Sequence, residues 1–193
     1  MRSDGAGVTQ TVSGCGDRRL RTALGAYPTG VTVVTCLSTD GRPVGITANS
    51  FVSLSLQPAL VSIALHKAGR YVAAFVESGA FTVNVLRADQ QGLSNHFARP
   101  SACSWESIEH RISESGHLIL ADVAAYFECR LVRQHDAGDH VLLIGEILQY
   151  DSDEDARSLV FMRGRYGIYS PGDSGPPLVA GEWPMCDMPI GWA

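Results

Sequence analysis

The sequence predicts a mainly β protein, an antiparallel β-barrel with short peripheral helices. Six or more segments are rich in β-branched residues and alternate between apolar and polar positions, the pattern of half-buried strands. Most are separated by turn signals, and the helical patterns between them are short. Successive parallel strands would need long helical crossovers, so these spacings favour an antiparallel barrel.

The first elements are a helix and a hairpin. An amphipathic pattern predicts a helix over residues 17–27. Alternating segments predict strands over 30–38 and 43–51, joined at Asp40-Gly41, a dipeptide typical of hairpin turns.

The middle of the chain alternates strands with short helices. Strands are expected over 59–66 and 80–86, and helices over 70–77 and near 88–97. An irregular stretch follows the second of these helices.

The last elements are a long hairpin and a closing segment. Strands are expected over 124–134 and 140–150, on either side of a loop at 135–139. Residues 159–167 close the folded body.

Composition sets the domain plan and excludes several classes of protein. The 193 residues fit one domain over 17–169, with a flexible N-terminal tail over 1–16 and a Pro/Gly-rich C-terminal tail over 170–193. No apolar run approaches the ~18 residues of a membrane span, and we expect a cytoplasmic protein without a secretory leader. A net charge of −5 argues against nucleic-acid binding and favours a small-molecule partner.

Two polar features suggest a binding site. Thr47, Asn49, Ser50, Ser53 and Ser55 gather where a strand gives way to a turn, and their hydroxyls and turn amides could hold an anion or a polar ring. Capping bonds within a polar turn would explain the same residues.

The second feature is His140, which opens a strand after a Gly-Asp turn. A histidine there is either a structural residue or a ligand-binding one. The five cysteines form no C-x-x-C pair, and no second ligand is near enough in sequence to suggest a metal site.

A serine protease is a remote alternative. The segment 171–179, PGDSGPPLV, is similar to the nucleophile segment of trypsin-like proteases. However, Pro176 removes an amide donor, and no histidine has the expected sequence setting, so Ser174 is a poor candidate nucleophile. Neither a Rossmann fingerprint nor a P-loop occurs.

Several separated motifs, in order, resemble the short-chain flavin reductase family, the reductase components of two-component flavin-dependent monooxygenases. They are YPTGVTVVT (27–35), GRPVGITANSFVSLSLQPALV (41–61), FTVNVL (81–86), LSNHFA (93–98), ECR (128–130), GDHVLLIGEI (138–147) and FMRGRYG (161–167). The resemblance implies an FMN-binding split barrel with flavin at a homodimer interface.

The resemblance also implies site residues. The flavin ring and ribityl chain would lie on Thr47, Ala48, Asn49, Ser50, Phe51, Ser53 and Ser55, beside Pro28, Thr29 and Gly30. Lys67 and Arg70 would face the phosphates, and Phe97 would line the pocket. His140, Arg163, Arg165 and Tyr166 would meet the nicotinamide cofactor.

The implied activity is NAD(P)H:flavin oxidoreduction. FAD or FMN would be a co-substrate reduced by NADH or NADPH, with no obligatory acid–base residue on the protein. Reduced flavin would pass to a partner monooxygenase or halogenase. A non-catalytic flavin-binding protein of the same fold is the main alternative.

Overall fold

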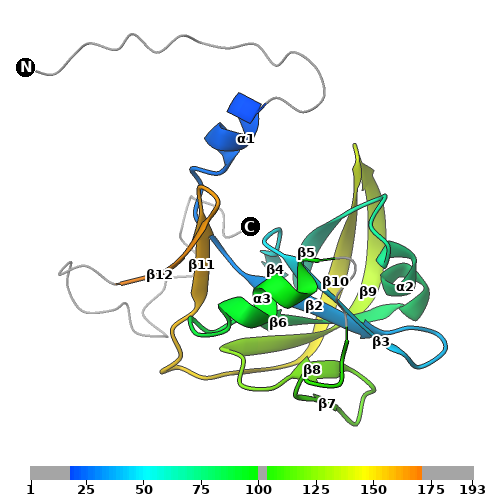
Figure 1. The fold of residues 1–193 in the computed structure, drawn as a ribbon. Helices are drawn as coiled ribbons and strands as arrows, with labels where there is room; N and C mark the ends of the chain where they lie inside the picture. The colour runs from blue at the N-terminus through cyan, green and yellow to red at the C-terminus, as the bar shows by residue number, and fades with distance from the viewer. Residues whose placement is uncertain (1–17, 100–103, 171–193) are drawn as a thin grey trace, which may run out of the picture.

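The computed structural model describes residues 18–99 and 104–170, and its centre is a seven-stranded antiparallel sheet (Figure 1). The strands lie in the order β3-β2-β6-β9-β10-β5-β4. Their bounds are β2 (Thr32–Leu37), β3 (Pro43–Ala48), β4 (Val52–Leu56), β5 (Ala59–His66), β6 (Ala80–Val85), β9 (Ala125–Ala137) and β10 (His140–Ser152).

The sheet curls into a split barrel because its two edge strands follow each other in the chain. Only residues 49–51 separate β3 from β4, so the two edges of the sheet must come together. The edge strands β3 and β4 are not hydrogen-bonded to each other as a ladder, and the barrel is split between them. The predicted fold class, a mainly β split antiparallel barrel with short helices, is confirmed.

Short elements surround the barrel. The helices are α1 (Arg18–Leu24), α2 (Val72–Ser78) and α3 (Gln91–Phe97). A three-stranded sheet joins β1 (Thr29–Gly30), β11 (Leu159–Met162) and β12 (Arg165–Ile168), and β7 (His110–Ile112) pairs with β8 (Leu118–Leu120). In Figure 1, α1 and the β11–β12 hairpin stand away from the barrel, and we call them together the arm.

Two hydrophobic clusters form the core, and β2 contributes to both. Its alternating side chains place Val34 and Cys36 in one cluster and Val33 in the other. The first cluster includes Phe75 of α2, and the second includes Phe97 of α3. Each helix therefore covers a different part of the barrel.

Most predicted elements exist, and β5 has the predicted bounds, but three predictions needed correction. Residues 52–56, expected to be part of a polar turn, form edge strand β4. The loop expected at 135–139 is only the Gly138-Asp139 turn, because β9 continues to Ala137. The closing segment 159–167 is a separate hairpin outside the seven-stranded sheet.

Some predictions fall outside the described residues. They are the two flexible tails and the candidate nucleophile Ser174 of the protease-like segment. Of the tails, only Ser170, the first residue of the C-terminal one, is described. All of these stay predictions. Within residues 18–99 and 104–170, no helix is both long and apolar enough to span a bilayer. The same ranges contain no group of three or more His, Cys, Asp or Glu side chains arranged to hold a metal ion.

Candidate functional site

A groove of about 870 Å³ lies along the arm. This volume is within the ~300–1,000 Å³ usual for small-molecule sites. Six predicted cofactor residues line it: Pro28, Thr29, Gly30, Arg163, Arg165 and Tyr166. Apolar and aromatic side chains, among them Met162, Ile168 and Tyr169, supply the remaining wall.

Strand pairing brings these distant residues together. β1 pairs antiparallel with β11, which places Thr29 opposite Phe161. Arg163 and Gly164 form the turn after β11, both with positive φ (50° and 76°), as in a type I′ hairpin. The N–H of Arg163 donates to the carbonyl of Gly25 at 2.7 Å, so the hairpin is fixed to the end of α1.

The hydroxyl of Thr29 is a buried group that lacks a partner. Its Oγ1 is inaccessible to solvent and makes no hydrogen bond with any described residue. Leaving such a group unpaired costs about 1–3 kcal/mol. Thr29 lines the groove, so a polar group of a bound ligand would be a suitable partner.

Ser94 links the groove to the predicted flavin segment. Its carbonyl accepts from the Thr47 hydroxyl at 2.7 Å, and its own hydroxyl lies 2.9 Å from the Tyr166 hydroxyl. Ser94 is fully buried on α3, and Tyr166 lies on β12. Two predicted site segments therefore meet at a residue that sequence reasoning did not single out, although it lies within the LSNHFA motif.

The polar segment 47–55 has both structural and exposed members. The Ser50 hydroxyl donates to the carbonyl of Ala64 at 2.9 Å and accepts from its N–H at 3.0 Å, which extends the β4–β5 ladder by one step. Ser55 accepts from the N–H of Gln57. Asn49 is exposed, and Ser53 is half-buried on β4.

Two other members of this segment pack inward. Ala48 is buried, and Phe51 stacks on Phe127 with ring centroids 5.6 Å apart. The hydroxyls of Thr47 and Ser50 are already engaged within the protein. A ligand on this segment would therefore meet mainly Asn49, Ser53 and backbone groups.

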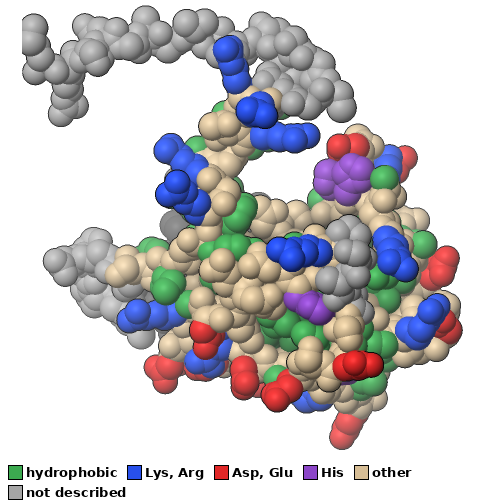
Figure 2. All heavy atoms as spheres, in the orientation of Figure 1, with side chains coloured by type: hydrophobic (Ala, Val, Ile, Leu, Met, Phe, Trp, Pro, Cys, Tyr) green, Lys and Arg blue, Asp and Glu red, His purple; other side chains and the backbone are tan. Residues whose placement is uncertain are grey.

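His140 lies at the tip of the β9–β10 hairpin beside another histidine. It is the direct ladder partner of His66 on β5, and the two rings meet edge to face at 5.1 Å. The Nδ1 atom of His140 lies 2.6 Å from Oδ1 of Asp139. This hydrogen bond is the main cause that lowers the pKa of the Asp139 carboxyl below its ordinary value. Figure 2 shows histidine, acidic and basic side chains together at this tip.

The two residues predicted to face phosphate lie near the same tip. Lys67 is paired with Asp136 at 3.1 Å, and its backbone N–H donates to the carbonyl of Asp139. The guanidinium of Arg70 lies over the ring of Tyr71, 5.5 Å from its centroid. A phosphate would have to compete with Asp136 for the only lysine in the chain.

Phe97 does not line an open pocket in this structure. It is 3% exposed and packs against Trp105 and against Gly45, where an added Cβ would come within 2.6 Å of its ring. Phe97 is thus part of the core that supports β3.

A cleft rich in arginine was missed by the sequence analysis. It measures about 620 Å³ and is lined by Arg18, Arg19, Arg21 and Arg163, with no acidic residue among its lining. Basic side chains gather along α1 in Figure 2. Arg163 lines both this cleft and the groove, so the two are adjacent. The turn geometry that brings Arg163 to α1 could not be inferred from spacing.

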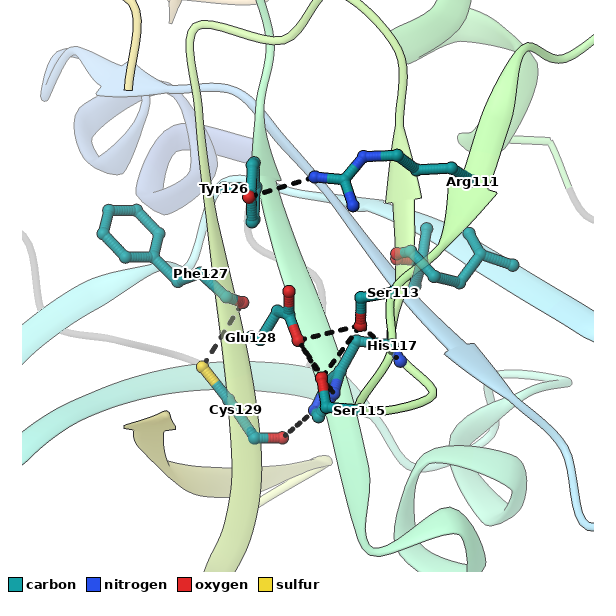
Figure 3. Close-up of polar contacts among 10 residues, drawn as sticks. Arg111, Ser113, Ser115, His117, Tyr126, Phe127, Glu128 and Cys129 are labelled. Carbon is teal, nitrogen blue, oxygen red and sulfur yellow. Dashed lines mark hydrogen bonds and ion pairs between the residues drawn. The ribbon is translucent and has the colours of Figure 1, made fainter. Parts of the chain in front are cut away.

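A second polar cluster is buried away from the groove (Figure 3). The carboxylate of Glu128, on β9, accepts from the hydroxyls of Ser113 and Ser115 and lies 3.2 Å from Nδ1 of His117. These three partners lie in the loop that joins β7 to β8. The cluster fastens that hairpin to the barrel.

Comparisons with known proteins agree with this architecture. Residues 24–170 match the family model of the flavin reductase like domain. An FMN reductase (NADH) of Agrobacterium fabrum is 40% identical over 153 residues, 79% of this chain and 86% of that protein. The reductase component of a flavin-dependent trigonelline monooxygenase of Acinetobacter baylyi is 38% identical over 163 residues, 84% of this chain and 52% of the relative.

A solved structure shares the fold. The NADH:FAD oxidoreductase of Streptomyces globisporus, in complex with NAD and FAD fragments, has a TM-score of 0.77 and 34% identity, over 82% of this chain and 96% of that one. This chain spans only about half the length of two of the curated relatives that it matches. The family match nevertheless covers nearly all of the described fold, and the chain belongs to the flavin reductase like domain family.

Proposed function

We propose that this protein is an NADH-dependent flavin reductase that supplies reduced FMN or FAD to a flavin-dependent monooxygenase or halogenase. The observation that carries the proposal is the family match over residues 24–170. It is supported by a relative of similar length that is named an NADH-dependent FMN reductase. The relative named as a monooxygenase reductase component supports the partner.

The residues present suit a flavin and a nicotinamide. We assign the flavin to the 47–55 segment and the adjoining groove, where the buried Thr29 hydroxyl needs a partner and Tyr166 offers an aromatic edge. Bound flavin would supply the ring that takes up a hydride from the dihydronicotinamide. The chain's own groups bind and orient the two rings, and no protein acid–base group is required.

Flavin is proposed to be a co-substrate. In the 47–55 segment, two of the hydroxyls are engaged within the protein, and the nearby lysine is paired with Asp136. The segment itself contains no charged residue that could hold a phosphate strongly, which favours release of the reduced flavin. NADPH remains an alternative to NADH as hydride donor.

We also propose a homodimer. Large apolar side chains are exposed on the arm or within a few residues of it in the chain: Leu24 (67%), Tyr27 (75%), Ile168 (56%) and Tyr169 (69%). Helix α1 has no buried residue. Exposed large apolar side chains are typical of an interface, and a second copy would cover them.

The proposed location is the cytoplasm. Cys36 and Cys129 are buried free thiols, which suits a reducing compartment.

The test is a steady-state assay that crosses FAD and FMN with NADH and NADPH. We expect NADH oxidation that depends on added flavin, and a nearly colourless protein after dialysis. NADH oxidation without added flavin and a stoichiometric yellow colour would indicate a prosthetic group. Flavin binding without oxidation of either NADH or NADPH would identify a non-catalytic binding protein. Light scattering tests the dimer, which a monomer at micromolar concentration would contradict.

A further inference from the structure

Positive charge is concentrated in the cleft between α1 and the β11–β12 turn. Four of the fourteen arginines of the chain line this cleft, although the net charge of the chain is −5. Three of them belong to α1, and the fourth, Arg163, belongs to the turn. A cleft lined by charges of one sign attracts ligands of the opposite sign. The ligand expected here is therefore an anion.

The arginines of the cleft lack the acidic partners that arginines have elsewhere in the barrel. Arg87, for example, lies 3.0 Å from Asp153. Among the described residues, no acidic side chain forms an ion pair with Arg18, Arg21 or Arg163. Arg18 and Arg21 are three positions apart on one short helix, so their like charges repel each other. An anion held between α1 and the turn would relieve this repulsion.

The conformation of the turn gives a second reason to expect a ligand at Arg163. Its φ is 50° and that of Gly164 is 76°, as in a type I′ turn. Asparagine and glycine favour the first position of such a turn, whereas a longer side chain disfavours it. The turn is anchored by the backbone N–H of Arg163, which donates to the carbonyl of Gly25 at 2.7 Å. Because any residue except proline could make that bond, the turn does not explain the guanidinium.

The groove beside the cleft suits an uncharged part of the same ligand. Arg163 lines both hollows, so an anion in the cleft would lie next to the groove. Tyr166, Tyr169 and Met162 on the groove wall can pack against a planar ring. A ligand that joins a planar ring to phosphate groups is a nucleotide.

We propose that the arginine cleft binds the diphosphate group of a nucleotide whose ring lies in the adjoining groove. Guanidinium groups bind phosphate through paired hydrogen bonds, and several arginines from two elements suit two phosphates better than one. The cleft volume of about 620 Å³ is within the usual range of small-molecule sites. The proposal goes beyond the proposed function, because the charges of the cleft favour a diphosphate whatever reaction takes place in the groove.

Calorimetric titration with ADP and AMP tests the phosphate site without catalysis. The two ligands have the same base and ribose, and they differ by one phosphate. We expect the wild-type protein to bind ADP at least about tenfold more tightly than AMP, the effect of one more set of charge-assisted hydrogen bonds. Arg21→Gln and Arg163→Asn should each raise the dissociation constant of ADP by about tenfold. Equal affinities of the wild-type protein for ADP and AMP would overturn the proposal.

Thermal unfolding separates a binding role of Arg163 from a structural one. Asparagine favours the positive φ of the turn and keeps the backbone N–H that donates to Gly25. Arg163→Asn should therefore leave the melting temperature unchanged or raise it, while ADP binds more weakly. A lower melting temperature together with weaker ADP binding would show that Arg163 supports the arm, and the proposal would fail at this residue.

Two control variants remove a positive charge outside the cleft. Arg133 is exposed on β9, and Lys67 is paired with Asp136 at 3.1 Å; neither residue lines either hollow. Arg133→Gln and Lys67→Gln should change the dissociation constant of ADP by less than about twofold. A loss of affinity in either control as large as that in the cleft variants would place the phosphates elsewhere and overturn the proposal.

Larger ligands identify which nucleotide uses the cleft. FAD and ADP-ribose carry a diphosphate, whereas FMN carries a single phosphate. If the cleft variants weaken FAD binding more than FMN binding, the ligand is the flavin dinucleotide. If they weaken only ADP-ribose binding, the ligand is the nicotinamide dinucleotide. Cleft variants that bind FAD and ADP-ribose as tightly as the wild-type protein would overturn the proposal.

These outcomes are separate from those that test the proposed function. If ADP binds as expected but neither NADH nor NADPH is oxidised with flavin, only the proposed function fails. If flavin-dependent oxidation occurs but the cleft variants bind all three diphosphates like the wild-type protein, only this inference fails.

Discussion

Nδ1 of His117 lies 3.2 Å from Oε2 of Glu128, and the two side chains are 5% and 2% exposed (Figure 3). On its other side, Nε2 of His117 lies 3.2 Å from the carbonyl of Cys129, an atom that can only accept. Nε2 must therefore carry a proton. Nδ1 faces both the carboxylate and the Ser115 hydroxyl, which lies 3.1 Å away, so every polar atom of the imidazole has a partner.

Glu128→Ala should destabilise the protein by about 3–5 kcal/mol, because it leaves the buried His117 without its carboxylate partner and removes the acceptor of the Ser113 and Ser115 hydroxyls. Denaturant unfolding followed by circular dichroism would measure the loss. Glu114→Ala is the matched control, since Glu114 is exposed on the same hairpin. Equal stability of the two variants would contradict a structural role for the buried carboxylate.

Cys36 and Cys129 should be unreactive in the folded protein. Burial raises the pKa of each thiol to about 12, and for Cys129 the Glu128 carboxylate adds to the effect. Only the thiolate reacts readily, so iodoacetamide near pH 8 should label these two positions only after unfolding. Peptide mapping by mass spectrometry provides the measurement, and rapid labelling of either site in the native protein would show that it opens.

Much of the fold could be predicted because the local sequence pattern favours the same conformation that tertiary packing requires. The 59–66 segment is a nearly continuous apolar run and pairs with a strand on each side, β10 and β4, so its predicted bounds agree with the structure. Strand β4 was missed because its serines and leucines resemble a polar turn, and pairing with β5 determines its conformation. Strands β7 and β8 have three residues each, too few for a period to show.

The candidate site could be predicted only in part. Sequence motifs suggested its residues, but whether a hydroxyl is available depends on neighbours in space. Ser50 is engaged by Ala64 and Thr47 by Ser94, contacts between segments distant in the sequence. Glu128 lies in the ECR motif, but its cluster could not be predicted, because Ser113, Ser115 and His117 reach it only when the β7–β8 hairpin folds onto β9.

Gly45→Ala should cost about 1–3 kcal/mol through overpacking. The new Cβ would lie 2.6 Å from Cε1 of Phe97 and 3.1 Å from Trp105, so the aromatic pair would have to shift. Gly92→Ala on α3 is the control, because nothing lies within 4 Å of its Cβ position and alanine favours a helix. Thermal unfolding of both variants measures the difference, and a Gly45→Ala protein as stable as wild type would mean that Phe97 is free to move.

Tyr166→Phe should loosen the arm from α3. The Tyr166 hydroxyl donates to Oδ1 of Asn95 at 3.1 Å and accepts from the buried Ser94 hydroxyl at 2.9 Å, while its ring packs edge-on against Phe161. Phenylalanine keeps the ring contact but leaves Ser94 without this partner, so we expect a stability loss of about 1–3 kcal/mol. Because Tyr166 lines the groove, the dissociation constant of flavin, measured by fluorescence quenching, should rise as well. Tyr169→Phe is the control, since Tyr169 lines the same groove but is 69% exposed. If both variants lose equal stability, the Ser94–Tyr166 contact does not hold the arm in place.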